Sequence, residues 1–211
     1  MRDSIADGRR RRGVYVACFA IWLAAVAFGV RAASEYDAQP GAPADPPSSW
    51  PRASALPRRP DVPTLVAFVH PRCPCSRATL AELNVVMNRM RGRVTADVVF
   101  MRPSGVPANW TRTGSWRRAH EIPGATVLAD TDGIEAQRFQ ARTSGQIVLY
   151  DRDGRLVFDG GITASRGHEG DNAGRRELLA LLAGGTGDHA TSRVFGCALF
   201  DARVPATQNG S

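Results

Sequence analysis

Residues 64–90 constrain the fold of this chain more than any other stretch of its sequence. An apolar run at residues 65–69 meets the sequence HPRCPC at residues 70–75, and an amphipathic pattern follows at once. The apolar run is short and bounded by prolines, as in a buried central strand, whereas the later apolar residues recur at the three- and four-residue spacing of a helix. We therefore predict two cysteines on a turn between a strand and a helix.

This turn predicts thiol chemistry. Pro74 suits the first position of a helix, where no backbone hydrogen bond is lost. Cys73 is then expected at the N-cap and Cys75 in the first turn. The positive end of a helix can lower the pKa of a nearby thiol and make its thiolate available at neutral pH. Cys73 is accordingly the expected nucleophile.

The N-terminal segment predicts a membrane anchor. Four arginines at residues 9–12 precede an uncharged apolar run at residues 14–30, which reaches the lower limit of about 17 residues that can span a bilayer. The arginines would keep the N-terminus in the cytoplasm. We expect a cytoplasmic basic tail at residues 1–13 and a single-pass inner-membrane anchor at residues 14–33. Cys18, inside the run, is expected to take no part in chemistry.

A cleaved signal peptide is the alternative, because Val30, Arg31 and Ala32 form an acceptable cleavage site. The apolar run is longer than the roughly 7–15 residues usual in a signal peptide, which favours the anchor. Both alternatives put the rest of the chain in the periplasm or another extracytoplasmic space.

The formal net charge of +7 does not indicate a nucleic-acid-binding protein, because much of it belongs to the N-terminal segment. From Ser34 onward, 21 arginines face 18 acidic residues. That is the balance of an ordinary soluble surface. We expect the membrane as a partner and no nucleic acid.

Residues 34–61 predict a linker. They are rich in proline, with alanine, serine, glycine and aspartate, and show no hydrophobic period. Such a segment buries too little apolar surface to fold alone, and its prolines keep it extended. We expect a tether, with Trp50 as a residue that could dock, followed by a folded domain at residues 62–205.

The folded domain alternates strand and helix patterns. Strands are expected at residues 94–101 and 125–128, with a weak helix pattern at 116–120 between them and a short helix at 134–139. Residues 147–150 and 155–158 form a predicted hairpin, because the DRDG sequence between them is a strong turn signal. A last helix is expected at residues 172–183, closed by two glycines.

This order of elements resembles the thioredoxin fold. The resemblance covers about residues 62–183 and rests on the cysteine turn, on Asp132-Gly133 before a short helix, and on the YDRDGRLVFDGG hairpin. The chain is similar to membrane-anchored bacterial thioredoxin-like proteins that carry a Cys-Pro-Cys turn. The resemblance implies an α/β fold, with a central mixed sheet flanked by helices, and a redox or metal-handling thiol site. Fold alone does not decide which.

Two departures from the family pattern bear on function. Only Pro74 separates the two thiols, where the family has two residues. The family also places a cis-proline before the first hairpin strand, and here Gly145 stands in that segment. In the family this proline aids peptide docking and keeps metals from the thiols. Its absence therefore weakens the prediction of standard disulfide exchange and favours the prediction of metal binding.

The topology that the resemblance implies brings more residues to the thiol end of the sheet. The loop at residues 160–170 leaves the hairpin there, so Arg166 and His168 are candidates to lower a thiol pKa, carry a proton or bind a metal. His70 and Arg72 flank the cysteines directly. Residues 184–196 are long enough to return Cys197 to the same end, where a disulfide with Cys73 or Cys75 is feasible.

Three functions stay open. The leading hypothesis is a cofactor-free thiol–disulfide oxidoreductase, in which one thiolate of the turn attacks a protein or small-molecule disulfide and the other thiol, or Cys197, resolves the product. The second is Cu(I) binding by Cys73 and Cys75 with His70, His168 or Cys197, with Cys73, Cys75 and His168 as the working set. The third is an anchored, non-catalytic interaction module.

Overall fold

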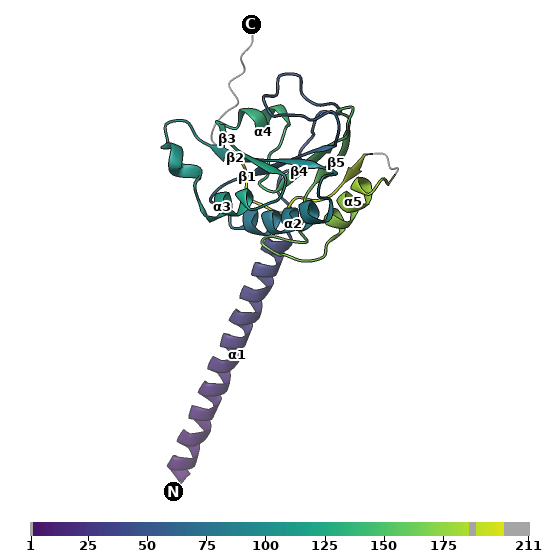
Figure 1. Ribbon diagram of the computed structural model, residues 1–211. Coiled ribbons are helices and arrows are strands. Elements are labelled where there is room, and N and C mark those ends of the chain that lie inside the picture. Colours follow the sequence, from purple (N-terminus) through teal and green to yellow (C-terminus); the bar gives the residue numbers. More distant parts are fainter. Residues whose placement is uncertain (1, 186–188, 201–211) are drawn as a thin grey trace. The chain divides into compact units, whose positions relative to one another are not determined.

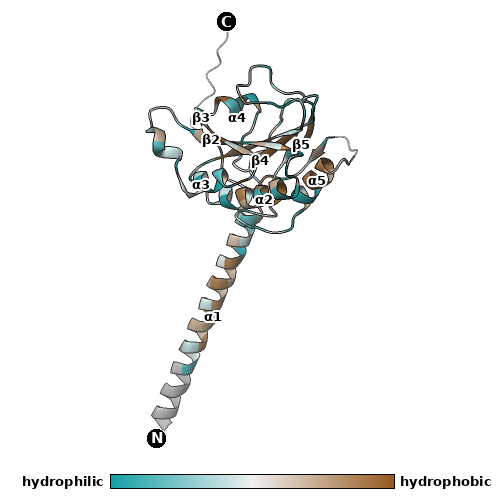
Figure 2. Ribbon diagram, viewed as in Figure 1, coloured by the Kyte–Doolittle hydropathy of each residue, from teal (hydrophilic) through white to brown (hydrophobic). Residues whose placement is uncertain are grey.

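The chain forms two compact units, Met1–Ala38 and Gln39–Ser211, in a computed structural model that describes residues 2–185 and 189–200. The first unit is helix α1 (Arg2–Ala38), whose segment Arg12–Ala38 is long and apolar enough to cross a membrane. Figure 2 shows apolar residues along its middle. The helix extends beyond the predicted residues 14–33, and an Arg31–Glu35 ion pair of 2.8 Å supports the added last turns.

The second unit is built on one six-stranded mixed sheet with the strand order β3-β2-β1-β4-β5-β6 (Figure 1). The strands are β1 (Thr64–Val69), β2 (Thr95–Arg102), β3 (Ala125–Thr131), β4 (Gln146–Tyr150), β5 (Leu156–Gly160) and β6 (Ala190–Thr191). The first three run parallel, β4 is antiparallel to both β1 and β5, and β6 is parallel to β5. The central strand β1 is buried along its whole length, as predicted.

Helices cover both faces of this sheet. They are α2 (Cys75–Arg89), the 3-10 helix η1 (Ala108–Thr111), α3 (Gly114–His120), α4 (Ile134–Arg138) and α5 (Ala173–Leu182). Helices α2, α3 and α5 lie on one face and α4 lies on the other (Figure 1). The apolar stripe predicted for α2 is confirmed, because its members are all buried: Leu80, Leu83, Val86, Met87 and Met90. The fold is thioredoxin-like, and each predicted element is present within a few residues of its expected bounds.

The proline-rich segment differs from the expected free tether. Residues 39–63, which we call the proline strap, follow the surface of the domain. Gly41 N donates to Val194 O, and Trp50 N donates to Gly154 O, both at 2.8 Å. Leu56 is buried. The folded unit therefore begins at residue 39 and not at residue 62, while its predicted end at residue 205 lies outside the described residues.

Apolar contacts explain why the strap is held in place. The sheet face opposite α2 is covered only in part by the short helix α4. Trp50 packs edge-on against Phe139 and Tyr150, with ring centroids 5.1 and 5.3 Å apart. Tyr150 also donates its hydroxyl proton to Pro47 O at 2.9 Å. Proline removes backbone donors but leaves carbonyl acceptors free, so the strap can accept such bonds.

Replacing Trp50 by alanine should lower the free energy of unfolding of the domain by about 3 kcal/mol, the low end for a core aromatic, because Trp50 is half-buried. Urea denaturation of the full chain in detergent, followed by circular dichroism, measures this change. Arg52→Ala, at an exposed position of the same strap, is the matched control and should change it by less than about 0.5 kcal/mol. Equal stability of the two variants would show that the strap lies outside the cooperative unit.

Candidate thiol site

Three cysteines from two distant parts of the chain form one group, which we call the thiol cluster. The sulfur atoms of Cys73, Cys75 and Cys197 all lie within 4.8 Å of one another. The Sγ atoms of Cys73 and Cys197 are 2.7 Å apart, although 124 positions separate the two residues in the sequence. Cys73 and Cys75 are buried and Cys197 is half-buried. The return of Cys197 to the thiol end of the sheet, predicted as feasible, is present.

The turn between β1 and α2 positions the first two cysteines. Cys73 N donates to His70 O, and Ser76 N donates to Cys73 O, both at 3.1 Å. Helix α2 begins at Cys75, with Pro74 at the N-cap in helical geometry (φ −58°). The helix thus starts one residue later than predicted, because Pro74 carries the cap. Cys73 still lies directly before the positive end of the helix dipole.

Two buried serines tie three segments together beneath the cluster. Ser76 Oγ donates to His70 O at 2.9 Å, and it lies 2.9 Å from Ser144 Oγ. Ser144 Oγ accepts a hydrogen bond from His70 N at 2.8 Å. The end of β1, the start of α2 and the turn before β4 are joined in this way. The sequence reading missed both roles, although Ser76 was visible as a polar residue on the apolar stripe of α2.

Backbone pairing holds Cys197 in the cluster. Ser144 N donates to Cys197 O at 2.8 Å, and Leu199 N donates to Arg142 O at 2.9 Å, around an antiparallel bridge between Thr143 and Ala198. Leu199 is buried in the core between the sheet and the strap. The pairing requires a glycine before Cys197, because a Cβ atom at Gly196 would lie 1.9 Å from Ser144 O.

Gly145 lies where the thioredoxin-like proteins that the sequence resembles have a cis-proline, and it forms a different turn. Its φ of +98° is accessible to glycine but not to proline, whose ring fixes φ near −65°. A Cβ atom there would also lie 2.9 Å from Thr79 Oγ1. The described residues contain no cis peptide bond. This turn leaves the backbone of residues 142–144 available to pair with the Cys197 segment.

Arg166 lies beside the thiol cluster, as predicted. Its guanidinium donates to Gly196 O at 2.6 Å and to Gln39 O at 3.2 Å, so it joins the Cys197 segment to the start of the strap. The loop that carries Arg166 is held against α2, because Gly170 N donates to the carboxylate of Glu82 at 2.6 Å. Arg175 of α5 pairs with the same carboxylate. The loop thereby holds a positive charge next to the thiols.

The two predicted histidines lie outside the group of sulfurs. His168 Nδ1 is 2.7 Å from Ser165 Oγ and 3.0 Å from Arg166 O, on the exposed side of the loop. His70 Nδ1 accepts a hydrogen bond from Arg72 N at 3.2 Å. The structure does not bring the predicted copper set of Cys73, Cys75 and His168 together, and among the described residues it is Cys197 that lies with the other two sulfurs.

Trp110, in η1, is a neighbour of the site that sequence reasoning missed. The ring of His70 packs edge-on against it, with centroids 5.7 Å apart. The guanidinium of Arg72 lies over the same indole at 4.8 Å. A cation–π contact of this kind orients Arg72 along the tryptophan. No periodic pattern surrounds Trp110 in the sequence, so nothing local indicated its place.

The electrostatics of the cluster separate its thiols. Burial raises the pKa of Cys73, but a hydrogen bond from the Cys197 thiol and further ones from the backbone amides of residues 75, 76 and 197 outweigh it, so the net pKa lies below its ordinary value. Burial and the nearby Cys73 raise the pKa of Cys75. The same causes raise the pKa of Cys197 to about 12. Arg166 opposes both increases. Cys73 is thus the thiol of the cluster that ionises most readily.

No protein-family model and no curated protein matches the chain. Solved structures do. A hypothetical protein of Sinorhizobium meliloti matches 65% of this chain and 78% of its own at 22% identity and a TM-score of 0.54. An uncharacterized conserved protein of Geobacillus kaustophilus matches 80% of this chain and 95% of its own at 20% identity and a TM-score of 0.56. These similarities establish the fold and not the activity.

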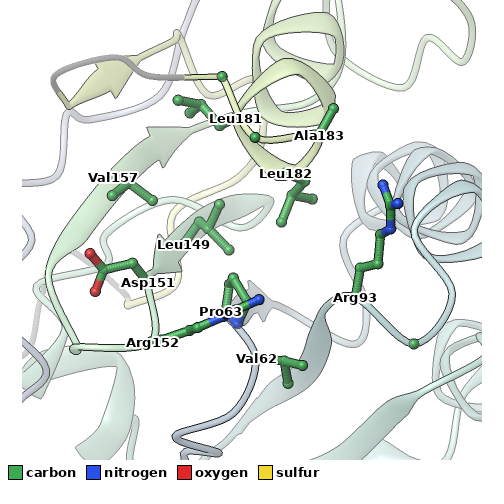
Figure 3. Close-up of a pocket in the computed structure, with 13 residues that line it drawn as sticks. Val62, Pro63, Arg93, Leu149, Asp151, Arg152, Val157, Leu181, Leu182 and Ala183 are labelled. Carbon is green, nitrogen blue, oxygen red and sulfur yellow. The ribbon is translucent and has the colours of Figure 1, made fainter.

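A separate pocket of about 550 Å³ lies at the opposite end of the sheet (Figure 3). It is bounded by the residues before β1, by the β4–β5 hairpin and by the end of α5. Leu149, Val157 and Leu182 form its apolar wall, and Arg93 stands at its side. No cysteine lines this pocket.

The lowered pKa of Cys73 predicts a specific pH dependence. After reduction, the rate of alkylation of Cys73 by iodoacetamide should fall as the pH drops through a midpoint below about 8.5, the ordinary value for cysteine. Cys197→Ala removes the largest of the hydrogen bonds that lower the pKa of Cys73, so the midpoint should rise and the reaction at pH 7 should slow. Mass spectrometry of the Cys73 peptide measures both. Cys18→Ala is the matched control, and an unchanged midpoint in Cys197→Ala contradicts the assignment.

Proposed function

We propose that this protein is a thiol–disulfide oxidoreductase in which Cys73 attacks and Cys197 resolves. The observation that carries the proposal is the 2.7 Å contact between the two sulfurs, with the pKa of Cys73 lowered and that of Cys197 raised. A disulfide bond needs a sulfur separation of about 2.05 Å, so a small movement brings the two sulfurs to bonding distance. The substrate class is a protein or small-molecule disulfide, and no cofactor is needed.

The exchange balances in two steps. The Cys73 thiolate attacks one sulfur of the substrate disulfide, which forms a mixed disulfide and expels the other sulfur as a thiolate that takes up a proton. The Cys197 thiol then loses its proton and attacks Cys73 Sγ, which releases the second substrate thiolate. The substrate gains two electrons, and the protein holds a Cys73–Cys197 disulfide. A dithiol reductant would restore the cluster, and the reverse sequence would oxidise a substrate dithiol.

The charges in the cluster determine when Cys197 becomes reactive. Repulsion by Cys73 contributes to the raised pKa of Cys197. Once Cys73 enters the mixed disulfide its negative charge is gone, so that contribution disappears and Cys197 ionises more readily. Arg166, whose charge lowers the pKa of Cys197, then favours the new thiolate. The resolving thiol is thus protonated before attack and becomes reactive after it.

We propose that α1 anchors the chain in a membrane with the domain outside the cytoplasm. The segment Arg12–Ala38 has the length and hydropathy for a span, and the arginine cluster at residues 9–12 favours a cytoplasmic N-terminus. An extracytoplasmic compartment permits stable disulfides, which suits the proposed chemistry.

Trapping the mixed disulfide tests the exchange. The full chain in detergent is mixed with a disulfide-bonded peptide, and the products are mapped by mass spectrometry. Wild type should collect a Cys73–Cys197 disulfide, whereas Cys197→Ser should hold the peptide on Cys73 at least about tenfold longer. Cys75→Ser should resolve as wild type does, and Cys18→Ser is the matched control. A peptide adduct that survives Cys73→Ser, or a Cys73–Cys75 product in wild type, would overturn the assignment.

A second candidate is Cu(I) binding by the three thiolates. The convergence of three sulfurs within 4.8 Å favours it, because soft thiolate ligands select Cu(I). Competition with a Cu(I) chelator under anaerobic conditions should then give one ion per chain in wild type and in His168→Ala. Each serine variant of the thiol cluster should bind at least about tenfold more weakly. Equal copper in Cys197→Ser and wild type excludes this site.

A further inference from the structure

The turn before β4, which lies beside the thiol cluster, is paired with the chain's own residues 196–199. Ser144 N donates to Cys197 O at 2.8 Å. Leu199 N donates to Arg142 O at 2.9 Å, so the two segments run antiparallel. An extended peptide that docks on an edge of this kind needs the same backbone donors and acceptors. A polypeptide substrate therefore meets an edge that is already occupied.

The proline strap covers the same turn from a second direction. Thr143 Oγ1 donates to Ala42 O at 2.9 Å. The strap passes so close to the turn that a Cβ atom at Gly41 would lie 2.3 Å from Thr143 Cγ2. Arg166 connects the two covers, because its guanidinium donates to one carbonyl group in each. The backbone of the turn is thus held between two segments of the chain.

The side chain of Leu199 anchors residues 196–199 in the core. Leu199 is 2% exposed and belongs to the apolar cluster that contains Phe68 and Tyr150. Displacing the segment would expose this side chain and break its backbone hydrogen bonds, and both changes cost free energy. A peptide that docks on the turn has to offset this cost, whereas a disulfide without a polypeptide backbone does not need the turn.

The cysteines lie close to the surface along the turn between β1 and α2. Cys73 is 4% exposed, but its neighbours Arg72 and Pro74 are both exposed. Cys75 is 9% exposed, and Cys197 is half-buried. The thiol cluster is therefore within reach of a molecule of a few heavy atoms that approaches along this turn.

We propose that the thiol cluster is selective for small disulfides over disulfides within a polypeptide chain. This inference rests on the proposed thiol exchange and narrows its substrate class. In either case the Cys73 thiolate forms a bond to one substrate sulfur, the substrate S–S bond breaks, and the other half leaves as a thiolate that takes up a proton. With a small disulfide residues 196–199 stay in place, so Cys197 remains beside Cys73 to resolve the product.

Two disulfides with the same reacting group and different lengths of backbone measure the selectivity. One is the disulfide of N-acetylcysteinamide, and the other is that of an acetylated, amidated peptide with two alanines on each side of its cysteine. The reduced full chain in detergent is mixed with each, and mass spectrometry follows the loss of the Cys73 thiol. Dithiothreitol gives the intrinsic rate ratio of the two disulfides. The protein should prefer the small disulfide about tenfold more than dithiothreitol does, the effect of two net hydrogen bonds.

Variants that loosen either cover should reduce this preference. Leu199→Ala loosens residues 196–199 and Thr143→Val releases the strap, and each should lower the preference by about threefold or more. Thr126→Val, at an exposed position of β3, is the matched control and should leave it unchanged. Both disulfides meet the same thiolate, so a change in the pKa of Cys73 cancels in the ratio. The conservative Thr143→Val variant keeps the test valid if Leu199→Ala does not fold.

The outcomes separate this inference from the proposed function. If the wild-type protein and dithiothreitol show the same preference, the selectivity is absent and the inference is overturned, while the exchange stands. A preference that neither Leu199→Ala nor Thr143→Val reduces also overturns it. If neither disulfide consumes the Cys73 thiol, the proposed exchange itself is wrong.

Discussion

The pairing of Ser144 with Cys197 is the interaction on which the thiol cluster depends. It joins the turn before β4 to the segment that follows α5. The hydrogen bonds of Ser76 and Ser144 connect this turn to the end of β1 and to the start of α2. Without it, Cys73 would keep its burial, which raises the pKa of a thiol, and the amide donors at the start of α2. The largest of the hydrogen bonds that lower this pKa comes from Cys197. The reactivity of Cys73 is thus a tertiary property and not a property of its turn.

This dependence on distant residues explains which features of the structure could be predicted from the sequence. The strand before the cysteines, the stripe of α2 and the DRDG hairpin are local patterns, and local patterns predicted the fold to within a few residues. The roles of Ser76 and Trp110 arise from partners far along the chain, and no periodicity marks them. The strap was predicted wrongly for a related reason. Its proline content indicates a segment that does not fold alone, but in the structure the strap packs on the apolar sheet face that α4 leaves uncovered.

The structure also shows what the turn at Gly145 does in place of a cis-proline. The resemblance implies that a cis-proline at this place assists peptide docking. Here the left-handed turn presents the backbone of residues 142–144 to the chain's own residues 196–199. A substrate that approaches Cys73 along this backbone has to displace that segment first. The likeness of fold therefore coexists with a different approach to the thiol, which is why similarity alone cannot assign the reaction.

The sequence distance between Cys73 and Cys197 has a consequence for biosynthesis. A ribosome adds roughly 5–20 residues per second, so the 124 positions between them correspond to about 6–25 s of synthesis. During that interval Cys73 and Cys75 exist without their third partner. A nascent chain that emerges into an oxidising compartment carries an unprotected pair of thiols until its last segment arrives. The order of synthesis makes the C-terminal segment the final step in the maturation of the site.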